Sequence, residues 1–209
     1  MGLLKKFLGQ CRRPEGILGS IMLAGMDIGH ASVARWGLGH LDASEDAPRD
    51  IVDLGCGGGQ NVGRLLEMYP SARAMGIDHS PLSVAKARAR HAEAIAAGRC
   101  AVEEGDVSAL ALEAESFDFA TAFETVYFWP GLEACFAQVA RILRPGGRFL
   151  IVDELDGRSP WGARFARIID GMRDVGQEEI EAALRTAGFG EIVAHHHPSR
   201  SWLAVLARK

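Results

Sequence analysis

The residue types best suited to ligand chemistry lie in a glycine loop, residues 55–59, which reads Gly-Cys-Gly-Gly-Gly. A short apolar run with Asp53 near its end precedes the loop, and an apolar pattern with helical spacing begins at Val62. Glycine allows positive φ and lets a ligand approach the bare backbone. A helix start behind the loop offers unpaired N–H groups. The segment therefore predicts a strand, a tight loop and a helix that hold a nucleotide-like ligand at the carboxyl end of a parallel strand.

The spacing of the glycines narrows the choice of nucleotide. The dinucleotide fingerprint requires a third glycine where this chain has Gln60, and the Lys-Ser/Thr pair of a phosphate-binding P-loop is missing. What remains is Asp-x-Gly-x-Gly-x-Gly, formed by Asp53, Gly55, Gly57 and Gly59. This pattern resembles the first motif of the class I S-adenosylmethionine-dependent methyltransferases.

A second acidic residue follows at a spacing that suits ribose binding. Residues 73–78 predict a strand that ends at Asp78, about twenty residues beyond the loop, where a carboxylate can accept both ribose hydroxyls. The alternative is an ordinary carboxylate in a turn. Ser80 has the position of an N-cap, Pro81 that of the first turn, and Gly98 that of the C-terminal stop, so we expect one helix between them.

Later landmarks continue the resemblance. Residues 100–108 predict a strand that breaks at Gly105, and the resemblance implies that Asp106 accepts a hydrogen bond from the adenine amino group while the backbone of Val107 reaches the ring. Residues 116–124 predict a buried strand. The cofactor contacts implied by the resemblance are Asp53, Gly55, Cys56, Gly57, Asn61, Asp78, His79, Ser80, Asp106, Val107, Phe123 and Glu124.

The order of the expected elements predicts an α/β fold. Strands and helices alternate over residues 50–154, which is typical of a parallel, doubly wound sheet. Residues 143–149, Leu-Arg-Pro-Gly-Gly-Arg-Phe, resemble the late structural motif of the family, and residues 192–197 and 201–207 predict two final strands. We expect a Rossmann-like, seven-stranded, mostly parallel sheet with helices on both faces and an antiparallel last strand.

Length and composition fit one domain. The chain has 209 residues, of which 48% are hydrophobic and 24% charged. We expect a methyltransferase domain at residues 49–209 and a helical extension or lid at residues 1–48, with a polar linker over residues 42–48 and a short amphipathic helix near the start. A net charge of −4 argues against nucleic acid as a partner. Four scattered cysteines indicate reduced thiols in the cytoplasm, and no apolar run is long enough to span a membrane. We expect a monomer or a homodimer.

The reaction expected from S-adenosylmethionine is an in-line transfer of a methyl group to a small, partly apolar acceptor. The protein must mainly position the two reactants, and a base is needed only for an acceptor that loses a proton. His30, in a junction between two expected helices, is the candidate of greatest interest. Tyr127, Phe128 and Trp129 form an aromatic group, and one or two of these rings could pack against the acceptor or the sulfonium. The candidates for a base are His30, His40, Glu124, Tyr127 and Asp153.

Three alternatives bear on function. The histidine run at residues 195–197 suggests a metal cluster, but neighbouring side chains on a strand point to opposite faces, so we expect no metal site. A catalytically silent, cofactor-binding regulatory or accessory subunit would carry the same motifs. A nicotinamide-dependent oxidoreductase is disfavoured by Gln60.

Overall fold

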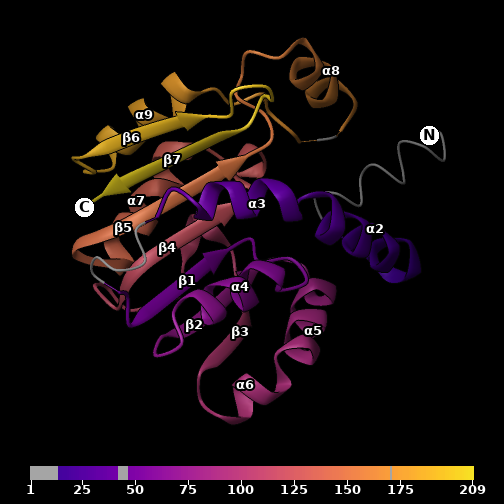
Figure 1. The fold of residues 1–209 in the computed structure, drawn as a ribbon, viewed down its shortest axis with the longest axis vertical. Helices are drawn as coiled ribbons and strands as arrows, with labels where there is room; N and C mark the ends of the chain where they lie inside the picture. The colour runs from indigo at the N-terminus through magenta and orange to yellow at the C-terminus, as the bar shows by residue number, and fades with distance from the viewer. Residues whose placement is uncertain (1–13, 42–46, 170) are drawn as a thin grey trace.

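A seven-stranded sheet forms the centre of the protein (Figure 1). The computed structural model describes residues 14–41, 47–169 and 171–209. The strands occur in the spatial order β3-β2-β1-β4-β5-β7-β6. Their bounds are β1 (Asp50–Leu54), β2 (Arg73–Asp78), β3 (Cys100–Glu104), β4 (Phe117–Phe123), β5 (Leu143–Asp153), β6 (Ile192–His196) and β7 (Leu203–Arg208).

The sheet is mostly parallel, and β7 is the strand that runs the other way. β1 pairs in parallel with both β2 and β4, β2 with β3, and β4 with β5. β7 is inserted between β5 and β6 and is antiparallel to both. The strand order reverses between β1 and β4, which is where open α/β sheets bind their ligands. The predicted fold class is confirmed.

Helices cover both faces of the sheet (Figure 1). One buried cluster joins the sheet to α7 and α9, and a second joins its other face to α3, α4 and α5. The helices are α2 (Gly16–Gly29), α3 (Ala31–Leu38), α4 (Gln60–Met68), α5 (Pro81–Arg90), α6 (Ala92–Ala96), α7 (Leu132–Ile142), α8 (Pro160–Ile168) and α9 (Gln177–Thr186), with 3₁₀ turns η2 (Val107–Ala109) and η3 (Val126–Phe128). Within the described ranges, none of these helices has the length and apolar character needed to cross a bilayer.

Helices α2 and α3, which follow each other end to end at His30, bring the N-terminal part of the chain to the sheet (Figure 1). A Cβ atom on Gly37 would lie 2.4 Å from Cγ2 of Val152, so α3 can approach β5 this closely only with glycine at that position. His30 forms the junction between the two helices, as predicted. The expected amphipathic helix and most of the expected linker lie outside the described residues.

The predicted helix between Pro81 and Gly98 is wrong in one respect, because it is broken at His91 into α5 and α6. The His91 side chain is buried, and its Nε2 donates a hydrogen bond of 2.7 Å to the carbonyl of Gly59. The backbone at His91 has φ −106° and ψ 23°, outside the helical region. Helical spacing along the chain cannot reveal a break that a tertiary contact produces.

Candidate functional site

The glycine loop between β1 and α4 forms the floor of the site. Gly55, Gly57 and Gly59 have φ values of +78°, +52° and +80°, a left-handed conformation that side chains with a Cβ rarely adopt. The N–H groups of Gly55 and Cys56 both donate to the carbonyl of Ile77 on β2, at 2.8 and 3.0 Å. The loop is therefore fixed to the end of the neighbouring strand, and no side chain of its three left-handed residues covers its backbone.

Asp78, at the end of β2, joins this loop to the next one. Its Oδ2 accepts the Gly57 N–H and its Oδ1 accepts the Ser80 N–H, both at 2.8 Å. The residue is 8% exposed and lies at the wall of the cavity. Ser80 caps α5 by accepting the Ser83 N–H, and its hydroxyl donates to the carbonyl of Pro14 at 2.9 Å. Asp78 thus has two oxygens that are already oriented by the backbone, on a strand end that faces the cavity.

Asp106 follows β3 and begins η2. Its Oδ1 accepts the N–H and the hydroxyl of Ser108 at 2.8 and 2.7 Å. These hydrogen bonds, with a smaller contribution from the charge of His79, lower the pKa of Asp106. The group therefore stays ionised at neutral pH and can accept further hydrogen bonds from a ligand.

A cavity of about 430 Å³ lies along the carboxyl ends of these strands. Its volume is within the range of small-molecule sites, roughly 300–1,000 Å³. The structure brings most of the predicted site residues together at its wall. They are Gly55, Cys56, Gly57, Asn61, Asp78, His79, Asp106, Val107, Phe123 and Glu124, together with His30 and Tyr127.

Two predicted cofactor contacts, Asp53 and Ser80, do not line the cavity. Asp53 is 2% exposed, and one of its carboxylate oxygens accepts the hydroxyl of Thr121 on β4 at 2.7 Å. Burial, with a smaller contribution from Asp78, raises the pKa of Asp53 to about 7. Asp53 joins β1 to β4 beneath the loop, so its position suits a supporting role. Ser80 is fully buried by its capping contacts.

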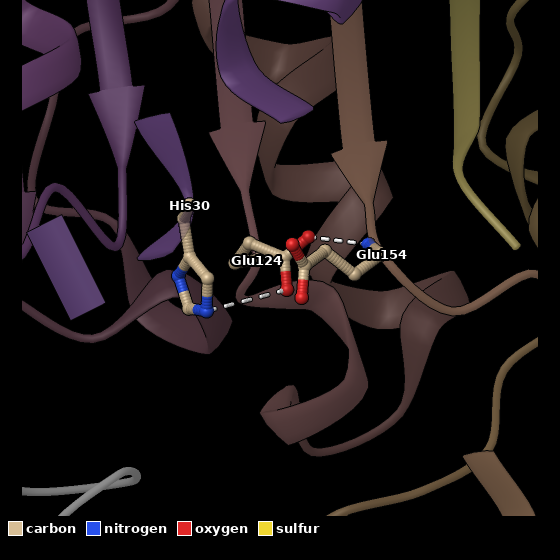
Figure 2. A group of neighbouring side chains, drawn as sticks. All are labelled: His30, Glu124 and Glu154. Atoms are coloured by element: carbon tan, nitrogen blue, oxygen red, sulfur yellow. Dashed lines mark hydrogen bonds and ion pairs between the residues drawn. The ribbon is translucent and has the colours of Figure 1, made fainter. Parts of the chain in front are cut away.

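The far end of the cavity is built around Glu124, directly after β4 (Figure 2). Its Oε2 accepts the Tyr127 hydroxyl at 3.0 Å and lies 4.0 Å from Nε2 of His30. Its Oε1 accepts the backbone N–H of Glu154, directly after β5. The carboxylate therefore lies between residues from three elements.

Burial controls the protonation of these groups. It raises the pKa of Glu124 well above its usual range, and the charges of Asp153 and Glu154 add to the effect. Burial also raises the pKa of Tyr127, again with a contribution from Glu124. Tyr127 therefore keeps its proton at neutral pH and donates it in a hydrogen bond to Glu124. Tyr127 is for this reason a poor candidate for a base.

The remaining candidates for a base lie elsewhere. His40 stacks on His195 with ring centroids 4.0 Å apart, and neither residue lines the cavity. Asp153 is 1% exposed and does not line it either. Trp36 packs against Trp202, with 5.9 Å between ring centroids, and does not line the cavity.

Sequence reasoning missed Glu154 and Arg64. Glu154 follows an apolar strand whose carboxyl end adjoins that of β4, so the strand-end rule that selected Asp78 could have found it. Arg64 lies one turn into α4, where its Nη1 donates to Asn61 Oδ1 at 2.6 Å and its side chain lines the cavity. Apolar residues complete the far end of the cavity: Phe128, Leu155, Ile169 and Met172.

The strand order, the glycine loop and the acidic strand ends define a nucleotide-binding α/β protein of the methyltransferase type. Residues 51–147 match the family model described as a methyltransferase domain. The chain belongs to the class I S-adenosylmethionine-dependent methyltransferases, and S-adenosylmethionine is the cofactor of its domain.

Comparisons with individual proteins agree with this family. The chain is 33% identical over 143 residues to the O-methyltransferase cnsE of Penicillium expansum, covering 66% of this chain and 51% of that protein. It is 29% identical over 150 residues to the O-methyltransferase resE of Aspergillus sclerotiorum, covering 70% of this chain and 56% of that protein. The chain thus spans about half the length of these curated relatives.

One solved structure has a similar fold over the whole chain. It is a methyltransferase from Haloferax volcanii in complex with the Trm112 methyltransferase activator, with a TM-score of 0.77 and 19% sequence identity. The alignment covers 100% of this chain and 98% of that one, and at this identity it bears on the fold alone.

Proposed function

We propose that this protein transfers a methyl group from S-adenosylmethionine to a small-molecule acceptor. The observation that carries the proposal is the hydrogen bond from Gly57 to Asp78, which holds a glycine loop and a strand-end carboxylate at one cavity wall. In this proposal Asp78 accepts the ribose hydroxyls, and Asp106 and Val107 contact the adenine. The match to O-methyltransferases supports an oxygen acceptor.

The cavity residues fit this cofactor. Gly55, Gly57 and Gly58 of the loop line the cavity, and Asp78 and Asp106 offer oriented carboxylates to hydroxyl and amino donors. Asn61 and Arg64, near the start of α4, are placed to bind a carboxylate at the amino-acid end. When bound, the cofactor supplies a methyl group already activated on a sulfonium.

The chain itself must align the acceptor and exclude water. The apolar side chains at the far end, with Tyr127 and Trp129, enclose the acceptor so that its attacking atom lies in line with the methyl group. Residues 49–209 form the cofactor domain in this proposal, and helices α2 and α3 serve as a lid that brings His30 over the site.

Titration calorimetry tests the proposal directly. S-Adenosylhomocysteine should bind with one site per chain, and NAD(H) should not bind. Turnover of S-adenosylmethionine against a panel of hydroxyl and amine acceptors then separates an enzyme from a silent accessory subunit. Binding of NAD(H) in preference to S-adenosylhomocysteine would refute the proposal.

A further inference from the structure

Three potential metal ligands meet at the far end of the cavity (Figure 2). His30 comes from the α2–α3 junction, Glu124 from the end of β4 and Glu154 from the end of β5. A nitrogen or oxygen atom from each lies within 4.8 Å of the other two. In the described part of the chain, this is the one group of three such residues that meets this distance limit.

These distances suit a single ion. Divalent cations bind nitrogen and oxygen ligands at about 2.0–2.4 Å, so two ligand atoms of one ion lie no more than about 4.8 Å apart. An imidazole with two carboxylates is a mixed donor set that suits Mn²⁺, Fe²⁺ or Zn²⁺. Three protein ligands would leave further positions open toward the cavity, as in metal sites that bind a substrate.

The surroundings orient the ligands. The Tyr127 hydroxyl and the Glu154 backbone N–H fix the Glu124 carboxylate, and such outer contacts are typical of metal sites. The Glu124 side chain is 7% exposed, whereas His30 is about one-third exposed and faces it from the lid. One ligand is therefore rigid, and another depends on the position of the lid.

The charge at this end also favours a cation. Among the described residues, Arg64 is the one lysine or arginine that lines the cavity, and it is bonded to Asn61 at the other end. The positive charge of Arg200 partly offsets the rise that burial causes in the pKa of Glu154. The Arg200 guanidinium lies over the Trp202 ring, however, and does not line the cavity. Two neighbouring carboxylates repel each other unless a proton or a cation lies between them.

We propose that His30, Glu124 and Glu154 bind one divalent metal ion, and that a position this ion leaves open toward the cavity holds an oxygen atom of the acceptor. This replaces the expectation of a protein without a metal site. The choice of acceptor rests on the proposed function, whereas the ion site does not.

The test is a titration of the protein saturated with S-adenosylhomocysteine, using Mn²⁺ as the probe. Calorimetry should give one Mn²⁺ per chain, and the electron paramagnetic resonance signal of free Mn²⁺ should fall in the same proportion. Glu154→Gln and His30→Ala should each weaken binding about tenfold or more, while both variants keep their affinity for S-adenosylhomocysteine. Glu93→Gln, an exposed change on α6, is the matched control and should bind Mn²⁺ unchanged.

Two results would overturn the inference. One is no saturable binding of Mn²⁺, Mg²⁺ or Zn²⁺ stronger than about 1 mM, the weak end of protein cation sites, in protein that binds S-adenosylhomocysteine. The other is Mn²⁺ binding that Glu154→Gln and His30→Ala leave unchanged, which would place the ion elsewhere. Because the affinity for S-adenosylhomocysteine is measured separately, loss of the metal site is distinguishable from failure of the proposed function.

Discussion

Replacing Asp78 by alanine tests the cofactor site most directly. In the proposed complex its carboxylate accepts two ribose hydroxyls in addition to the N–H groups of Gly57 and Ser80. A hydrogen bond to a charged group contributes about 1.5–3 kcal/mol, so two could contribute about 3 kcal/mol or more. Water can replace part of this interaction in the variant. We therefore expect the Kd for S-adenosylhomocysteine to rise about 10- to 100-fold, or about 1.4–2.7 kcal/mol.

The effect must be separated from a general loss of stability, and Asp118 offers a matched control. Its Oδ2 accepts the N–H groups of Arg49 and Asp50 at 2.8 and 2.9 Å, and its Oδ1 pairs with Arg144 at 2.7 Å. These residues lie at the amino ends of β1, β4 and β5, away from the cavity. Asp118→Ala should lower the melting temperature and leave the Kd unchanged.

Calorimetry and thermal unfolding on the same samples give a clear decision. The reasoning is refuted if Asp78→Ala binds S-adenosylhomocysteine with a Kd within about twofold of the wild-type value. An equal loss of affinity in Asp118→Ala would attribute the effect to stability.

Three further outcomes follow from particular backbone and charge positions. In urea denaturation, Gly55→Ala should lower the free energy of unfolding more than Gly98→Ala. Both glycines have positive φ, but a Cβ on Gly55 would lie 2.3 Å from a side-chain oxygen, whereas a Cβ on Gly98 would meet open space. The raised pKa of Asp53 means that the stability it contributes is full below pH about 4 and is lost as pH rises through about 7; Asp53→Asn should flatten this dependence in urea titrations between pH 4 and 8. Gly37→Ala should destabilise the protein by about 1–3 kcal/mol and lower its melting temperature, whereas Gly29→Ala, with no atom within 4 Å, should not.

The parts of the site that sequence could predict are those determined by local chemistry. The left-handed backbone at Gly55, Gly57 and Gly59 follows from a loop between a strand and a helix, since few other residues adopt it. Asp78 is found by the same logic because a strand end and a fixed spacing place it beside the loop. The alternation of strands and helices likewise predicts the parallel sheet.

The parts that sequence could not predict depend on tertiary contacts. The break at His91 follows from a contact with Gly59, 32 residues earlier in the chain. The Pro-Gly-Gly segment lies within β5 as an irregularity, since Phe117 pairs with Leu143 while Phe119 pairs with Arg148. The pattern along the chain identifies a turn there, but the sheet decides how the turn is accommodated.

The acidic residues at the strand ends show why residue type alone does not assign a role. Asp53 accepts a hydrogen bond from a hydroxyl on the neighbouring strand and does not reach the cavity. Asp78 accepts hydrogen bonds from two backbone N–H groups and lies at the cavity wall. Glu124 and Glu154 come together because β4 and β5 are adjacent, although they are 30 residues apart in the chain. The strand order thus determines which carboxylate supports the loop, which can accept the cofactor's hydroxyls and which can face an acceptor. A substitution elsewhere in the chain that keeps both glutamates but moves β5 relative to β4 should therefore separate Glu124 from Glu154 without disturbing Asp78.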